Sequence, residues 1–147
     1  MANSFQGSAV IHRPIGEVFA FLAAGTNDPK FSPRVQSIEK ATEGPVGVGT
    51  AFKSTVKDAG MKTQREFELT EYQEPTKIGW TERSQNMITV PSGGYDLEPA
   101  GEDTKLTVTN ELEGHGFGKL ILPLALRAAR RDADAFAARI KAAVESS

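Results

Sequence analysis

The chain has 147 residues, 39% hydrophobic and 24% charged, so its composition is that of an ordinary folded domain and excludes a disordered or fibrous protein. Its 17 Lys and Arg against 19 Asp and Glu leave a formal charge of -2, which argues against the broad basic surface that nucleic-acid binding requires. Cysteine is absent, which removes disulfides, thiolate catalysis and cysteine-based metal sites.

These properties predict a single domain over residues 1–147 that binds no nucleic acid, metal or cofactor. The N-terminal segment MANSFQGSAV lacks the basic start and apolar run of a secretory signal. The longest apolar stretch, residues 120–126, is interrupted by Pro123 and is far shorter than the ~20 residues of a membrane span. We therefore expect a cytoplasmic protein without a transmembrane segment.

The N-terminal third of the chain predicts one strand followed by short helices. Residues 5–12 alternate, with Ile11 on the apolar face and His12 on the other, as in a half-buried strand. Pro14 then begins an amphipathic helix over residues 14–23. Glycine and proline end this helix, and residues 29–33 support only one more helical turn.

The middle of the chain predicts six further strands joined by short connections. Strands are expected over residues 35–42 and 50–57, linked as a hairpin by the glycine-rich segment 43–49. The remaining strands are centred on residues 63–70, 78–80, 88–97 and 106–112. The segment PSGG interrupts the strand over residues 88–97. Short turns favour an antiparallel sheet, because parallel strands need a crossover connection.

The C-terminal segment predicts one long helix over residues 119–145. Apolar side chains recur there at spacings of three and four, with Pro123 expected near the first turn. The predicted fold class is therefore α+β: a seven-stranded curved antiparallel sheet wrapped around the C-terminal helix, with two short helices after the first strand. An apolar pocket is expected between the sheet and the long helix.

Several segments resemble the START-like (SRPBCC, helix-grip) superfamily, in its polyketide cyclase/dehydrase and lipid transport branch. They are HRPIGEVFAFLA, NDPKFSPRV, GPVGVGTAFK, EPTKIGW, YDLEPAGEDTKLTV and the terminal helix, and together they cover nearly the whole chain. The resemblance implies a sheet that grips the last helix over a cavity for lipids, polyketides or other apolar molecules. It implies no particular reaction, because the superfamily has no shared catalytic motif, so the catalytic residues stay unassigned.

Alternation places a few polar side chains on the apolar face of the sheet, where they are candidates to orient a ligand. Arg65 is the most pointed case, because a guanidinium beside Phe67 needs an anion, either Glu82 or a ligand carboxylate. An internal ion pair, or an arginine at a solvated cavity mouth, is favoured over a ligand carboxylate. Tyr95 and Asn110 are expected to donate hydrogen bonds to a carbonyl group. Ser54 and Thr63 share this face.

The other candidates are pocket walls and one loop histidine. The predicted walls are Trp80, Phe52, Phe67, Tyr95, Leu126 and Phe136. His115, in the loop EGHGFG, could lie at the pocket entrance, although a structural role is favoured for both histidines. No base is evident near Tyr95 and Asn110, and no spacing of metal ligands is present.

The leading hypothesis is binding or carriage of a small hydrophobic or amphipathic molecule between the sheet and the long helix. The second is a polyketide cyclase/dehydrase-like enzyme that holds a carbonyl substrate through Arg65, Tyr95 and Asn110. The third is a protein-interaction module that acts through the exposed sheet or the start of the long helix. There LILPLAL is more apolar than one buried face requires and could meet a lid, a partner subunit or a membrane surface, although core packing is favoured. A monomer and a homodimer are both compatible with the sequence.

Overall fold

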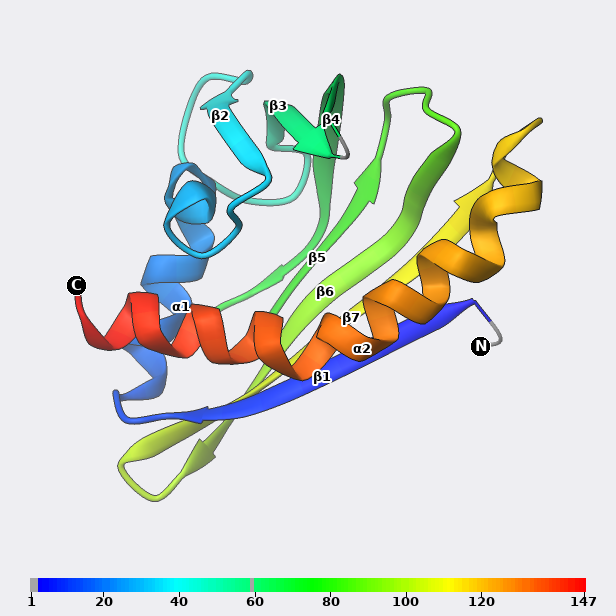
Figure 1. Ribbon diagram of the computed structural model, residues 1–147. Helices are drawn as coiled ribbons and strands as arrows, with labels where there is room; N and C mark the ends of the chain where they lie inside the picture. The colour runs from blue at the N-terminus through cyan, green and yellow to red at the C-terminus, as the bar shows by residue number, and fades with distance from the viewer. Residues whose placement is uncertain (1–2, 59) are drawn as a thin grey trace.

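The computed structural model of the protein describes residues 3–58 and 60–147. Its centre is one antiparallel sheet of seven strands in the order β1-β7-β6-β5-β4-β3-β2. The sheet is strongly curved and wraps partly around the long C-terminal helix (Figure 1). The strands are β1 (Ser4–Ile11), β2 (Val35–Lys40), β3 (Ala51–Asp58), β4 (Met61–Gln73), β5 (Lys77–Glu82), β6 (Ile88–Ala100) and β7 (Asp103–Gly114).

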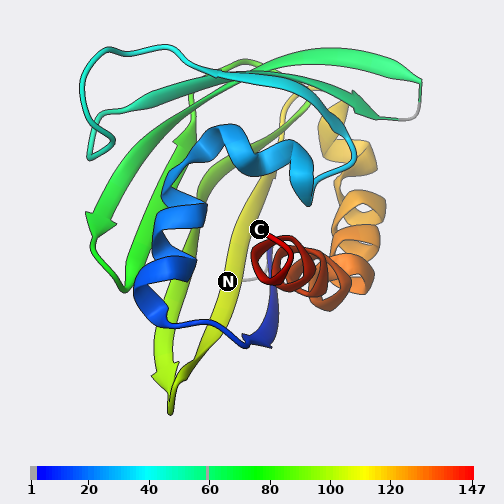
Figure 2. The ribbon, with the colours of Figure 1, turned by 90° about the vertical axis from the view of Figure 1, so that its left-hand side faces the viewer.

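Three helical segments lie on the concave side of the sheet. The short helix α1 (Ile15–Ala23) follows β1, and the 3-10 helix η1 (Gly25–Lys30) follows α1 directly. Figure 2 shows both segments inside the curve of the sheet, with the long helix α2 (Gly118–Glu145) beside them. No helix in the described part of the chain is long and apolar enough to cross a membrane.

The core fills the space between the concave face and the helices. Its fully buried side chains include Ile11 of β1, Phe19 of α1, Leu106 of β7 and Ile140 of α2. α2 packs so closely on β1 that a Cβ atom at Gly7 would collide with the backbone carbonyl of Ala133. Glycine at this one position lets helix and sheet approach backbone to backbone.

These observations confirm the predicted fold class and correct four details of it. The hairpin of β2 and β3 and the alternation in β3 and β4 are as expected. The second short helix forms over residues 25–30 rather than 29–33. β6 runs through PSGG, which only shifts its register against β7, and the strand expected over residues 35–42 ends at Lys40.

The fourth correction concerns Pro123, which lies in the second turn of α2 rather than the first. A proline there lacks the N–H that would donate to the carbonyl of Lys119, and such a gap lets a helix bend. Figure 2 shows the start of α2 running in a different direction from the rest of the helix. The first turns of α2 are thereby separated from the part that packs on β1.

Candidate functional site

One end of the concave face holds a closed network around Glu82. The Glu82 side chain has 0% exposure, and its carboxylate accepts hydrogen bonds from Arg65 Nη1 at 3.1 and 3.2 Å. Ser84 Oγ (2.6 Å), Asn86 Nδ2 (3.1 Å) and the backbone N–H of Val90 (2.9 Å) donate to the same carboxylate. The carboxylate is therefore fully paired within the protein, and Arg65 has the internal ion-pair partner that the sequence favoured.

The middle of the concave face carries a hydrogen bond between Trp80 and Asn110. Trp80 Nε1 donates to Asn110 Oδ1 across β6 at 3.2 Å. A Cβ atom at Gly93 would collide with both of these atoms, so glycine on the intervening strand makes room for the pair. The Asn110 carbonyl is thus occupied, whereas its Nδ2 group donates to no other described residue.

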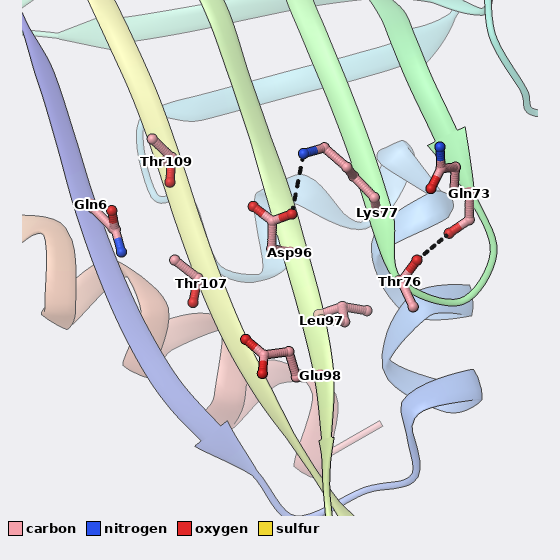
Figure 3. A pocket seen from close by; sticks show the side chains of 9 residues that line it. All are labelled: Gln6, Gln73, Thr76, Lys77, Asp96, Leu97, Glu98, Thr107 and Thr109. Carbon is pink, nitrogen blue, oxygen red and sulfur yellow. Dashed lines mark hydrogen bonds and ion pairs between the residues drawn. The ribbon is translucent and has the colours of Figure 1, made fainter. Parts of the chain in front are cut away.

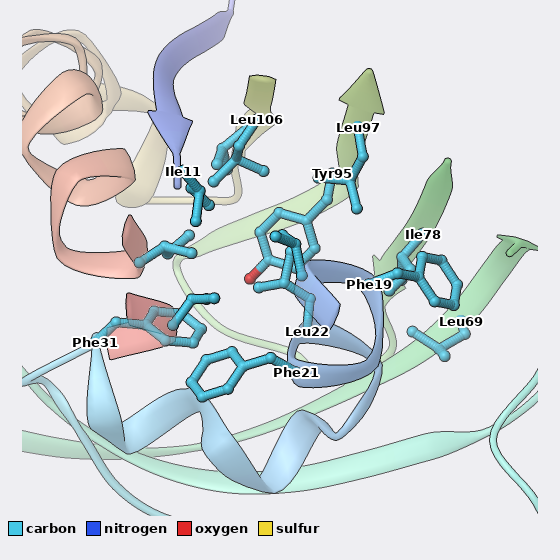
Figure 4. Packing of buried hydrophobic residues seen from close by; sticks show 14 of the residues in the cluster. Ile11, Phe19, Phe21, Leu22, Phe31, Leu69, Ile78, Tyr95, Leu97 and Leu106 are labelled. Atoms are coloured by element: carbon cyan, nitrogen blue, oxygen red, sulfur yellow. The ribbon is translucent and has the colours of Figure 1, made fainter. Parts of the chain in front are cut away.

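The other end of the concave face presents the hydroxyl of Tyr95. Tyr95 is only 7% exposed, and its ring packs edge-on against Trp80 with the centroids 4.7 Å apart. Figure 4 shows the hydroxyl pointing away from β6, toward the side of Leu22 and Phe31. No described residue forms a hydrogen bond with it. Among the described residues no fully enclosed side-chain oxygen or nitrogen lacks a partner, so this free hydroxyl must adjoin space that water can enter.

Asp28 of η1 is a second free polar group at this end, and no pattern in the sequence pointed to it. The residue is partly buried, and its carboxyl group forms no hydrogen bond or ion pair with a described residue. Burial raises the pKa of Asp28 to about 7. Burial also raises the pKa of the Tyr95 phenol well above its ordinary value, and the nearby Asp28 charge raises it further. Asp28, with a pKa near neutrality, therefore lies close enough to Tyr95 for its charge to raise the pKa of the phenol.

Of the predicted walls, Phe52 and Tyr95 belong to the buried core cluster, and Trp80 and Phe136 pack against it. Phe52 is 6% exposed and lies under η1, where a Cβ atom at Gly25 would be 2.8 Å from its ring. Phe136 of α2 packs edge-on against Phe31 at 5.7 Å. Leu126 is buried, whereas Phe67 is only partly buried. Trp80 and Tyr95 are thus brought together, while Phe52 and Phe136 support η1 and the segment after it.

Both histidines are bound to neighbours at the surface. His12 Nδ1 lies 3.0 Å from Asp103 Oδ2, and His115 Nε2 lies 2.8 Å from Thr89 Oγ1 and 3.3 Å from Glu113 Oε1. His115 precedes α2, away from Tyr95 and Asp28 along the concave face. Within residues 3–58 and 60–147, no group of three or more His, Asp or Glu side chains could hold a metal ion.

Of two hollows on the outside of the molecule, neither lies between the sheet and α2. The first, about 410 Å³, lies on the polar outer face of the sheet (Figure 3), where Lys77 pairs with Asp96 at 3.3 Å. The second, about 370 Å³, lies at the seam between the segment around Phe31 and the last turns of α2. The pocket expected under the long helix stays a prediction.

The second hollow nevertheless adjoins the Tyr95 end of the interior. Phe31 lines the hollow and is also part of the buried cluster that contains Tyr95. Arg139 fixes this segment by donating from Nε to the Phe31 carbonyl at 3.2 Å, while its other nitrogens pair with both Asp132 carboxylate oxygens. The hollow and the buried cluster that contains Tyr95 therefore share the Phe31 side chain.

Comparison with known proteins identifies the family. The model of the family described as polyketide cyclase / dehydrase and lipid transport matches residues 2–145, nearly the whole chain. The chain belongs to this family. No curated protein matches it.

Solved structures share the fold of this chain at low identity. A protein from Thermus thermophilus, TTHA0849, has a TM-score of 0.79 and 17% identity, with 97% of each chain covered. The Zhui aromatase/cyclase from Streptomyces sp. R1128 has 0.76 and 15%, covering 97% of this chain and 93% of its own. A START superfamily protein from Mycobacterium smegmatis has 0.73 and 13%, covering 95% and 97%. At these identities the likeness establishes the fold alone.

Proposed function

We propose that the protein binds a small hydrophobic or amphipathic molecule, a lipid, a polyketide or a similar compound, on the concave face near Tyr95. The observation that carries the proposal is the free Tyr95 hydroxyl, which is enclosed by apolar residues yet has no partner in the described protein. Because this hydroxyl adjoins space that water can enter, a ligand atom could take the place of water and accept its hydrogen bond. The family description, which includes lipid transport, supports the same proposal.

The ligand is expected to carry a hydrogen-bond acceptor such as a carbonyl oxygen. Tyr95 and the free Nδ2 of Asn110 both donate, and Asp28 donates as well when it is protonated. Trp80 supplies an aromatic wall between Tyr95 and Asn110. Apolar walls with a few converging donors are typical of sites for small molecules.

We also propose where the ligand enters. The hollow beside Phe31 shares this residue with the buried cluster that contains Tyr95. Movement of the Phe31 ring would connect them. Shortening Phe31 to alanine would therefore accelerate association of a ligand.

The test uses a defined probe, a naphthyl ketone dye whose fluorescence depends on polarity. Replacing Tyr95 with phenylalanine and Asn110 with leucine should each weaken dye binding about two- to tenfold, as expected for the loss of one hydrogen bond. Tyr72→Phe is the matched control, because it removes the hydroxyl of a tyrosine that packs elsewhere, against Phe19. Equal affinity in all variants, or no dye binding and no bound apolar compound in native mass spectra, would reject the proposal.

One observation favours an enzyme as a second candidate function. The enzyme hypothesis lacked a base, and Asp28 has a pKa of about 7 beside Tyr95. An ionised Asp28 could remove a proton from a carbon next to a carbonyl group, while Tyr95 stabilises the developing negative charge on the carbonyl oxygen. Turnover of a poly-β-ketone thioester that is lost in Asp28→Asn, with dye affinity retained, would support this candidate. Unchanged turnover in this variant would reject it.

A further inference from the structure

The start of α2 carries large apolar side chains on the face opposite to its buried one. Phe117, Leu120 and Leu124 are 69%, 72% and 68% exposed. Their spacings of three and four place them on one side of the helix, about half a turn away from the buried side chain of Leu126. Met87, from the loop before β6, adds a further side chain that is 49% exposed. We refer to Met87, Phe117, Leu120 and Leu124 as the apolar helix face.

The apolar helix face is fixed in place rather than being part of a loose terminus. The Met87 carbonyl accepts a hydrogen bond from the backbone N–H of His115 at 2.8 Å. A Cβ atom at Gly118 would collide with the same carbonyl, so the loop lies directly on the first residue of the helix. Thr89 Oγ1 lies 2.8 Å from His115 Nε2 and holds the turn before the helix. Met87 is thus held beside the exposed helix residues.

The charges on this part of α2 are of one sign, and the acid nearest to it in the preceding sequence is the exposed Glu113, which lies 3.3 Å from His115. Residues 114–131 contain no Asp or Glu, although the whole chain is slightly acidic. Lys119, Arg127 and Arg131 are exposed in this stretch, and Arg130, also basic, donates to the Ser4 carbonyl. Arg127 and Arg131 follow Leu124 by three and seven residues and therefore continue the same face of the helix. This side of the helix therefore carries apolar side chains up to Leu124 and basic side chains at Arg127 and Arg131.

We propose that this face docks the protein on an anionic lipid membrane. Exposed Phe, Leu and Met side chains beside Lys and Arg are typical of helices that lie in the membrane interface. The apolar side chains would enter the boundary of the acyl chains, and the arginines would lie among the phosphate headgroups. A second copy of the chain fits this face less well, because its own residues 114–131 offer no Asp or Glu to pair with Lys119, Arg127 and Arg131.

The experiment is sedimentation of the intact protein with lipid vesicles. One set contains phosphatidylcholine alone, and the other contains about 30% phosphatidylglycerol. Wild-type protein should bind the anionic vesicles at least tenfold more tightly than the neutral ones. Leu120→Gln/Leu124→Gln should lose at least tenfold of the anionic binding, and Arg127→Gln/Arg131→Gln should lose a similar amount, since each basic residue accounts for roughly fivefold.

Val48→Gln is the matched control. Val48 is 68% exposed, like Leu124, but lies in the loop between β2 and β3. It should bind vesicles like the wild type, and circular dichroism should show that all variants fold. Absence of binding to anionic vesicles, or equal binding by the leucine variant and wild type, would overturn the proposal. So would a dimer in light scattering that the leucine variant abolishes, because the face would then belong to a second copy.

Discussion

Replacing Glu82 with leucine is expected to destabilise the protein by about 3–5 kcal/mol. The Glu82 side chain is fully buried, and its carboxylate accepts hydrogen bonds from Arg65, Ser84, Asn86 and the backbone of Val90. Leucine removes all of these acceptors at once. It also leaves the Arg65 guanidinium, which is only 22% exposed, with the Ile88 carbonyl as its remaining acceptor.

The cost should fall when Arg65 is replaced as well. In Arg65→Met/Glu82→Leu no buried charge is left, and apolar side chains of similar size fill the space, so at least about 2 kcal/mol should be recovered. Urea unfolding measures both changes. The melting temperature should fall by about 10 °C in the single variant, since 1 kcal/mol corresponds to roughly 2–4 °C in a domain of this size.

Two results would refute this reasoning. A single variant that loses less than about 1 kcal/mol would show that the pair contributes little to stability. The second result is a double variant that is no more stable than the single one. It would show that the loss of stability comes mainly from the Ser84 and Asn86 donors, which have lost their acceptor, and not from the unpaired charge of Arg65. The dye affinity of the double variant shows whether Arg65 stabilises the fold or binds the ligand. The affinity should stay within about twofold of wild type, whereas a tenfold loss would show that Arg65 binds the ligand.

Two other changes test close packing and the buried acid. Gly7→Ala should cost about 1–3 kcal/mol in urea unfolding, because its Cβ atom collides with the Ala133 carbonyl, whereas Gly16→Ala, with open space around it, should be neutral or stabilising. Asp28 has a folded-state pKa raised from 3.8 to about 7, so its contribution to stability is complete below pH 4 and is lost as the pH rises to 7. The stability of Asp28→Asn relative to wild type should therefore rise as the pH is raised from 4.5 to 7.5, by up to about 4 kcal/mol. If the difference in unfolding free energy between variant and wild type stayed constant over this range, it would contradict the burial of Asp28.

The fold could be predicted because its determinants are local. Alternation in β3 and β4 sets which side chains face the core, and apolar spacing sets the buried face of α2. Sequence reasoning failed where a tertiary contact overrides a local signal. The glycines of PSGG suggested a break, yet β6 stays paired with β7 through this segment, and Gly93 instead makes room for the hydrogen bond between Trp80 and Asn110.

The candidate site was only partly predictable for the same reason. Alternation placed Tyr95, Asn110 and Arg65 on the concave face, but it could not show that Arg65 is paired and Tyr95 is free. Asp28 was missed because it lies in a turn signal, NDP, where an aspartate normally faces water. Its burial depends on how η1 packs against the sheet, a contact between segments far apart in sequence.

The pairing pattern along the concave face divides it into two unlike halves. Near the loop before β6, every donor around Glu82 has an acceptor, so a ligand that entered there would have to break bonds already made. Near α1 and η1, the Tyr95 hydroxyl and the Asp28 carboxyl have unused hydrogen-bonding capacity in apolar surroundings. Ligand specificity should therefore respond to substitutions at Tyr95 and Asp28 and be insensitive to those around Glu82 once stability is restored. A ligand whose affinity showed the opposite pattern would place the site at the other end of the sheet.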